Sequence, residues 1–136
     1  MNRDDAAALV ERYLEAFNAG DTAAMLALLD EGVEHHVNQG GVRRGHAAFS
    51  GFCAHMAACY SEQLRDIVVM TSADGSRAAA EFTVHGAYLK TDNGLPEARG
   101  QRYVLPAGTF FSLRDGRITR IATAYNLNDW IAQVSA

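Results

Sequence analysis

The sequence predicts an α+β domain in which amphipathic helices lie across a curved, mostly antiparallel sheet. Two β-rich runs, residues 100–113 and 117–126, flank a turn that contains Asp115-Gly116, which is a strong hairpin signal. Both runs are too apolar to form an isolated ribbon, so one face of the hairpin must be covered. The segments with helical periodicity that could cover it lie elsewhere in the chain. Helices segregated from a mostly antiparallel sheet are typical of the α+β class.

Length and composition fit a single domain over residues 1–136. The chain is 49% hydrophobic and 21% charged, and a chain of this length buries roughly two-thirds of its unfolded surface. The net charge of -4 and the absence of a basic cluster argue against a nucleic-acid partner. No run approaches the ~18 apolar residues of a membrane span, so no membrane partner is expected either.

The cysteines and the N-terminus indicate a cytoplasmic protein. Cys53 and Cys59 lie six residues apart in a predicted helix, which puts them on different faces and too far apart for a disulfide. Free buried thiols are typical of a reducing compartment. The first five residues begin an amphipathic pattern with acidic residues, and they lack the long apolar stretch of a signal peptide.

Two helices are predicted near the N-terminus. Asp4 or Asp5 is expected to cap the first helix, and Gly20 to end it. Asp21 is expected to cap a second, short helix that Gly32 ends. The apolar positions at helical spacing are Ala7, Leu9, Val10, Tyr13, Leu14 and Phe17 in the first helix, and Met25, Leu26, Leu28 and Leu29 in the second.

After the second helix, the sequence predicts a strand, a loop and a third helix. Residues 33–38 read as a strand with Val33, His35 and Val37 on one face, and residues 39–41 as a loop. A third helix is expected from Gly45-His46, and its buried face comprises Phe49, Phe52, Cys53, Met56 and Tyr60.

Four further strands are expected before the C-terminus. They span residues 63–71, 77–90, 100–113 and 117–126, with a turn at Asp74-Gly75. Asn128 or Asp129 is expected to cap a last short helix around Trp130.

Motifs at both ends of the chain resemble a known family. They are VERYLEAFNAGD at residues 10–21, VLPAGTF at 104–110, DGRI at 115–118 and YNLNDW at 125–130. With them the chain resembles ketosteroid isomerase and, more broadly, the nuclear transport factor 2-like superfamily, also described as SnoaL-like or cystatin-like. The most similar subgroup is the ketosteroid isomerase-related proteins. The resemblance implies a conical barrel whose curved sheet wraps around the helices, a pocket at its open end, and a homodimer packed through the sheet.

The resemblance also implies three catalytic positions, of which this chain keeps one. Tyr13 matches the tyrosine that donates a hydrogen bond to the oxyanion. The position of the carboxylate base falls at Val37, or at His36 with a one-residue shift. Gly108 occupies the position of the second, protonated carboxyl donor. Steroid isomerisation by the family mechanism is therefore not expected.

The catalytic candidates are Tyr13, His35 and His36. Tyr13 lies on the buried face of the first helix, where its hydroxyl needs a partner that a ligand oxygen could supply. His35 points inward if its strand is regular, whereas a β-bulge would select His36. An imidazole with a pKa near 6.5 is a good base at neutral pH. The plain alternatives are a core tyrosine bonded to protein or water and half-exposed histidines.

A second set of residues is expected to bind the ligand. Its members are Asn38, Phe52, Met56, His85, Phe110 and Tyr125. The sequence does not decide whether His85 lines the pocket or faces a dimer partner. No metal and no cofactor are expected, because the compact His-x-His and Cys-x-x-Cys spacings are absent.

Three functions remain open. The first is a small enzyme of the isomerase or lyase/cyclase type that moves a proton next to a carbonyl in a small apolar molecule. The second is a non-catalytic module that binds such a molecule, and the third is a dimerisation module. A roomy pocket with Tyr13, His35 and Tyr125 would favour the first two functions. A pocket filled by side chains such as Phe49, Phe82 and Phe110 would favour the third.

Overall fold

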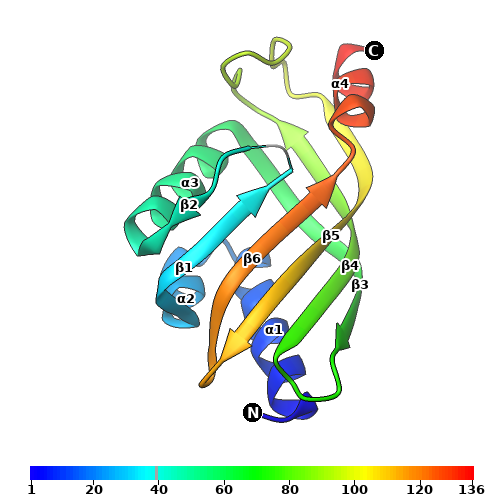
Figure 1. Ribbon diagram of the computed structural model, residues 1–136. Coiled ribbons are helices and arrows are strands. Elements are labelled where there is room, and N and C mark those ends of the chain that lie inside the picture. The colour runs from blue at the N-terminus through cyan, green and yellow to red at the C-terminus, as the bar shows by residue number, and fades with distance from the viewer. Residues whose placement is uncertain (39) are drawn as a thin grey trace.

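A computed structural model describes residues 1–38 and 40–136, and within them four helices accompany a six-stranded sheet (Figure 1). The elements in chain order are α1 (Arg3–Asn18), α2 (Thr22–Ala27), β1 (Leu29–Val37), β2 (Arg43–Arg44), α3 (Gly45–Cys59), β3 (Tyr60–Thr71), β4 (Arg77–Tyr88), β5 (Arg102–Arg114), β6 (Arg117–Tyr125) and α4 (Leu127–Ser135). The predicted α+β class is confirmed.

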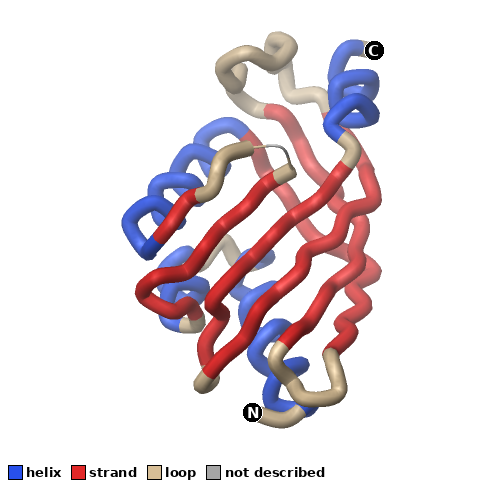
Figure 2. The backbone as a smooth tube through the Cα atoms, viewed as in Figure 1, coloured by secondary structure: helices blue, strands red, loops and turns tan. Residues whose placement is uncertain are grey.

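The sheet is curved and open. Its strand order is β2-β1-β6-β5-β4-β3, and β1 runs parallel to β6 while the other neighbouring pairs are antiparallel. Helix α1 contacts β3 and β4, and α3 contacts β1, β2 and β3, so both helices cover the same face (Figure 2). The expected conical barrel therefore takes the form of a sheet that is not closed, with β2 and β3 as its edges.

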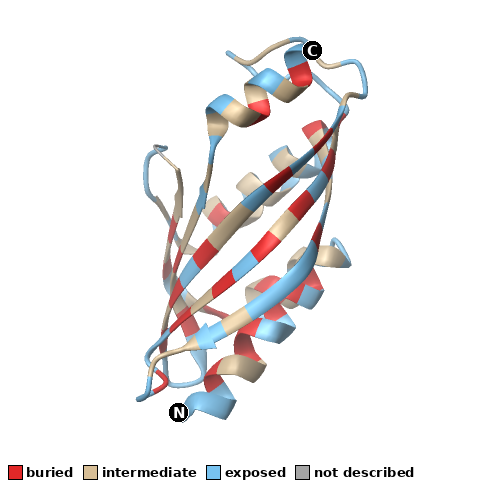
Figure 3. Ribbon diagram, turned by 90° about the vertical axis from the view of Figure 1, so that its right-hand side faces the viewer, coloured by how far each residue is buried: buried red, intermediate tan, exposed pale blue. Residues whose placement is uncertain are grey.

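The predicted hairpin is present. Asp115 and Gly116 join β5 to β6 with φ angles of 53° and 76°, the paired positive values of a type I′ turn. The alternation predicted for β4 is confirmed as well, because Ala78, Ala80, Phe82 and Val84 are buried on one face. Figure 3 shows this alternation of buried and exposed residues along the strands.

Two of the predicted helix caps are wrong. Asn2 caps α1 through a capping box with Asp5, in which each side chain accepts a hydrogen bond from the other residue's backbone N–H. Asn126 caps α4 by accepting from the Asp129 backbone N–H at 3.1 Å. In each helix the predicted acidic cap, Asp5 or Asp129, lies three residues after the residue that caps the helix. The cap predicted at Asp21 is confirmed, with the Ala24 backbone N–H donating at 3.0 Å.

The first strand starts earlier than predicted, and a second strand was missed. Helix α2 ends at Ala27, and Leu29 already belongs to β1, so Gly32 lies within a strand instead of ending a helix. The buried Leu29 pairs with Ile118 of β6. Strand β2 has only two residues, too few to give a periodic signal. Of the predicted loop at 39–41, residue 39 lies outside the described residues.

Both cysteines are free, Cys59 being buried and Cys53 half-buried. Within residues 1–38 and 40–136, none of the helices has the length and apolar character that crossing a membrane requires.

Asn18 fixes the end of α1 to the edge strand β3. Its Oδ1 accepts from the Leu64 backbone N–H at 2.8 Å, and its Nδ2 donates to the Leu64 carbonyl at 3.1 Å. The Gln63 side chain donates to the Asn18 carbonyl at 2.9 Å. The amide side chain thus pairs with the strand edge as a neighbouring strand would, and it holds α1 over the concave face.

We expect Asn18→Ala to lower the free energy of unfolding by about 1–3 kcal/mol, because it leaves the half-buried Leu64 backbone groups without partners. Urea unfolding followed by circular dichroism measures the change. Asn93→Ala is the matched control, since Asn93 is exposed in the connection between β4 and β5. Equal stability of the two variants would contradict the role of Asn18.

Candidate functional site

A cavity of about 870 Å³ lies between the concave face of the sheet and helices α1 and α3. Its volume falls in the range of small-molecule sites. Five of the predicted site residues line it: Tyr13, His35, Phe52, Met56 and Tyr125. The side chains around them are largely apolar, so the polar groups among them determine what the cavity can do chemically.

Tyr13 reaches the cavity from the middle of α1. Its ring packs against Phe49 and Phe111, with centroid distances of 6.5 Å and 5.6 Å. No described residue forms a hydrogen bond with its hydroxyl, although the side chain is only 6% exposed. Burial, and then the nearby Cys53 thiol, raise the pKa of Tyr13. The hydroxyl therefore stays protonated at neutral pH and is free to donate a hydrogen bond to a bound molecule.

His35 is the histidine that faces the cavity. The pairing of β1 with β6 runs without interruption from Glu34 to Val37, so His35 lies on the inner face as predicted for a regular strand. Its ring contacts Phe49 and Phe52 edge-on, with centroid distances of 5.1 Å and 4.7 Å. Its Nδ1 is buried without a hydrogen-bond partner.

Burial lowers the pKa of His35 to about 4, with smaller contributions from the charges of Arg43 and His36. The expectation of an unperturbed base near pKa 6.5 is therefore wrong for this residue. At neutral pH His35 is an uncharged imidazole with one N–H donor and one lone pair.

His36 lies on the opposite face of β1, which contradicts its placement as the base inside the cavity. It pairs with Ala122 of β6, and its Nε2 lies 3.7 Å from the Glu34 carboxylate. The β-bulge that would turn it inward is absent here, because the register shift in β1 occurs upstream, between Leu29 and Glu34.

Arg43 lines the cavity and was missed by the sequence analysis. It lies directly opposite His35 in the β1–β2 pairing, so both side chains project from the same face of the sheet. Its Cζ lies 4.5 Å from the centre of the Phe52 ring, and its Nη1 is buried without a partner. The neighbouring Arg44 projects from the other face and pairs with Glu34. Because β2 has only two residues, the sequence shows no alternation from which the opposite directions of Arg43 and Arg44 could be predicted.

Three predicted ligand-binding residues lie outside the large cavity. Asn38 accepts a hydrogen bond from the Tyr125 backbone N–H at 2.8 Å and lines a separate pocket of about 220 Å³. His85 is exposed on the outer face of β4. Phe110 is 51% exposed, and its neighbour Phe111 is the one that points inward. Placing His85 and Phe110 in the pocket was wrong because each alternates with an inward-facing neighbour.

Glu62 is a second lining residue that the sequence analysis missed. Its Oε2 accepts a hydrogen bond from the Tyr103 hydroxyl at 2.6 Å, and burial raises the pKa of Glu62. Tyr103 fits because Gly86 lies opposite it, where an added Cβ would come within 2.3 Å of its ring. The sequence predicts that this strand starts at residue 63, whereas β3 starts at Tyr60. Glu62 therefore lies outside the predicted strand, although it shares the inner face with Leu64.

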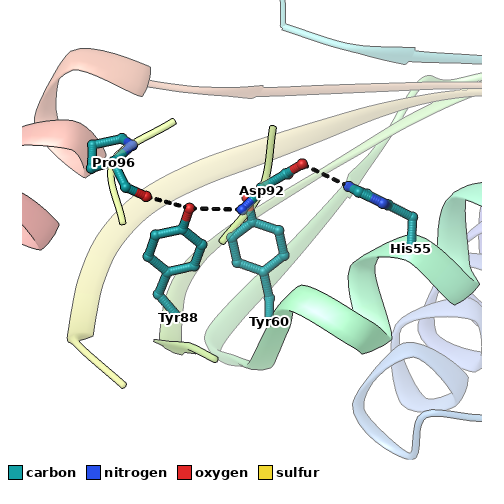
Figure 4. A network of polar contacts seen from close by, with 5 residues as sticks. All are labelled: His55, Tyr60, Tyr88, Asp92 and Pro96. Atoms are coloured by element: carbon teal, nitrogen blue, oxygen red, sulfur yellow. Dashed lines mark hydrogen bonds and ion pairs between the residues drawn. The ribbon is translucent and has the colours of Figure 1, made fainter. Parts of the chain in front are cut away.

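Asp92 organises a hydrogen-bond network at the C-terminal end of α3 (Figure 4). Its carboxylate accepts from the Tyr60 hydroxyl at 2.7 Å and lies 2.9 Å from His55 Nε2. Its backbone N–H donates to the Tyr88 hydroxyl, which donates in turn to the Pro96 carbonyl at 2.6 Å. The network fixes the connection between β4 and β5 beside the cavity.

One group of side chains has the composition of a metal site. The ligand atoms of His55, Cys59 and Asp92 all lie within 4.8 Å of one another. His55 and Cys59 are one helical turn apart on α3, a spacing that differs from the compact His-x-His and Cys-x-x-Cys motifs. His55 and Asp92 are already partners of each other, so two of the three ligand groups are paired within the protein.

The fold agrees with the comparisons to known proteins. Residues 10–121 match the family described as the SnoaL-like domain. The chain belongs to this family. The resemblance to the nuclear transport factor 2-like superfamily is thereby confirmed, since that superfamily includes SnoaL-like proteins. No curated protein matches the chain.

Three solved structures are similar to this SnoaL-like domain over nearly its whole length. A candidate polyketide cyclase from Xanthomonas campestris pv. campestris shares 56% identity, with 98% of this chain and 99% of that chain covered and a TM-score of 0.95. One from Pseudomonas putida KT2440 shares 60% identity, with coverages of 95% and 97% and a TM-score of 0.93. One from Silicibacter sp. TM1040 shares 58% identity, with coverages of 100% and 99% and a TM-score of 0.96.

We expect Arg43→Met to raise the pKa of His35 from about 4 towards its ordinary value, because it removes a positive charge that opposes protonation of the ring. The same variant should keep more of its stability as the pH falls from 6.5 to 4. The unfolded chain takes up a proton at His35 across that range, and the folded wild-type protein does not. NMR titration of the His35 ring measures the pKa. Arg44→Met is the matched control and should leave the pKa unchanged. An equal effect of both variants would contradict the assignment.

Proposed function

We propose that this SnoaL-like domain is a small enzyme of the isomerase or cyclase type that moves a proton next to a carbonyl in a largely apolar molecule. One observation carries the proposal. Tyr13 and His35 line the same cavity, their rings pack against the same Phe49 ring, and neither the Tyr13 hydroxyl nor the His35 ring is hydrogen-bonded to a described residue. The similarity to candidate polyketide cyclases at 56–60% identity supports the same reaction class.

In the proposed reaction the substrate carbonyl accepts a hydrogen bond from Tyr13. The lone pair of neutral His35 takes a proton from the carbon beside the carbonyl, and the electrons of the broken C–H bond form an enolate. Tyr13 stabilises the enolate oxygen. The imidazolium then returns its proton to a carbon of the product. The low basicity of His35 suits this role, because the aspartate base of ketosteroid isomerase has a comparable pKa of about 4.6.

Non-catalytic binding of a small apolar molecule is the second candidate function. Gly108, the position that the resemblance gives to the second oxyanion donor, lies opposite Glu81 on the outer face of β5. Its inward neighbours Ala107 and Thr109 line the cavity but carry no carboxyl group, so Tyr13 is left without the paired donor of the isomerase, which favours the binding function. The two candidates differ in turnover, which only the enzyme shows. A purely structural dimerisation module would not need a cavity of about 870 Å³ lined by unpaired polar groups.

We expect Tyr13→Phe to lower kcat by about 10²–10³-fold with little loss of stability, because its hydroxyl has no described partner and would act only on the developing oxyanion. Turnover of small steroids, polyketide-like ketones and lactones is measured alongside the melting temperature. Tyr88→Phe is the control. It loses the hydrogen bond to Pro96, so it should lower stability without a matching loss of turnover. Unchanged turnover in Tyr13→Phe would refute the catalytic role.

We also propose that the domain forms a homodimer through the outer face of the sheet. Val68, Met70, Val104 and Phe110 are each about half exposed on that face. Met70 is opposite Ala79, which in turn is opposite Phe110, so an apolar row crosses β3, β4 and β5. An apolar row of this kind is typical of a surface that another chain covers.

We expect Phe110→Lys to convert the dimer to a monomer, because the substitution buries a charge in the centre of the proposed interface. Sedimentation velocity measures the oligomeric state. Val42→Lys, which changes an exposed apolar residue outside the sheet face, should leave the dimer intact. A monomeric wild-type protein, or a dimer that survives Phe110→Lys, would rule the interface out.

A further inference from the structure

We propose that Arg43 and His35 form an anion subsite, so that the molecule bound in the cavity is an apolar acid that presents a carboxylate or an equivalent acidic oxygen group to them. This inference deepens the proposed function, and it rests on that function only in requiring that the cavity hold a small molecule. It names the class of the substrate, which the isomerase or cyclase chemistry alone leaves open.

The first argument is the lack of partners for two polar atoms, one on each of two directly opposed residues. Arg43 Nη1 and His35 Nδ1 are both buried, and neither has a hydrogen-bond partner among the described residues. A buried donor left unpaired is costly, so such groups in a binding cavity indicate a missing acceptor. A guanidinium can only donate, which means that its partner must be an acceptor.

The second argument concerns charge. The described ion pairs involve Arg44, His36 and His55, and none of them includes Arg43. The carboxylates that line the cavity are occupied elsewhere, Glu62 by Tyr103 and Asp92 by Tyr60 and His55. A half-buried guanidinium without a counter-ion therefore faces the cavity, and a bound anion would neutralise it.

The third argument is that both groups are held in place. The guanidinium stacks over the Phe52 ring at 4.5 Å, and the His35 ring meets the same phenyl group edge-on at 4.7 Å. Because Arg43 and His35 are directly opposed on β2 and β1, their Cβ atoms lie roughly 4.5–5.5 Å apart. A planar guanidinium fixed in this way suits the two oxygens of a carboxylate.

The subsite is compatible with the proposed chemistry of His35. If Nδ1 carries the proton and donates to the anion, Nε2 keeps the lone pair that accepts the substrate proton. The anion also favours the protonated ring, so the bound molecule would make His35 a stronger base. Glu62 and Asp92 line other parts of the cavity and would repel the acid group, which directs it to Arg43.

Binding of 2-naphthoate and its uncharged analogue 2-naphthamide to the intact protein, measured by isothermal titration calorimetry, tests the subsite. We expect the wild-type protein to bind naphthoate at least about tenfold more tightly than naphthamide, as for a charge-assisted hydrogen bond. Arg43→Met should abolish the preference, and Arg43→Lys should weaken it, because an ammonium keeps the charge without the planar fork. Arg44→Met should retain it.

A second readout follows the His35 ring by NMR. Naphthoate should raise the pKa of His35, and naphthamide should leave it near its value in the free protein. Equal affinity for the two probes, no binding of naphthoate, or an undiminished preference in Arg43→Met would each overturn the subsite.

The outcomes separate the subsite from the catalytic proposal. A preference for naphthoate in a wild-type protein that turns over none of the tested steroids, ketones and lactones supports the subsite and refutes the enzyme. Turnover of neutral ketones without any preference for naphthoate supports the enzyme and refutes the subsite.

Discussion

The alternation of side chains across the β-strands decides what the cavity contains. Three pairs of identical neighbours, at residues 35–36, 43–44 and 110–111, are each divided between the two faces of the sheet. One histidine, one arginine and one phenylalanine point inward, and their neighbours point outward. A shift of one residue in any of these strands would exchange the two sets. The chemistry of the site therefore depends on strand register as much as on composition.

Polar groups around the cavity fall into two kinds. Those at the C-terminal end of α3 are paired with one another, as in the contacts of Asp92 with Tyr60 and His55, and they fix the chain in place. Tyr13 and His35 have no such partners and remain uncharged, because burial opposes ionisation of both groups. Groups that the protein satisfies serve its structure, and groups that it leaves unsatisfied are available to a bound molecule.

Most of the fold could be predicted because its signals are local. The Asp115-Gly116 turn and the alternation along β4 were both evident in the sequence. The site was less predictable because it depends on long-range pairing. His35 was assigned to the cavity from the alternation within its own strand. Arg43 could not be assigned to the cavity, because a two-residue strand shows no alternation and the sequence does not indicate which strand β2 pairs with. The low pKa of His35 likewise arises from packing that no local pattern encodes.

The open edge of the sheet has a consequence for how such a cavity can change in size. In a closed barrel the number of strands and their stagger fix the internal diameter. Here α3 forms part of the wall, and side chains such as Phe52 and Met56 project from it into the cavity. Larger or smaller residues on this helix alter the internal volume without breaking any hydrogen bond between strands. Proteins of this architecture can therefore diverge to accommodate molecules of different dimensions by substitutions on one helix alone.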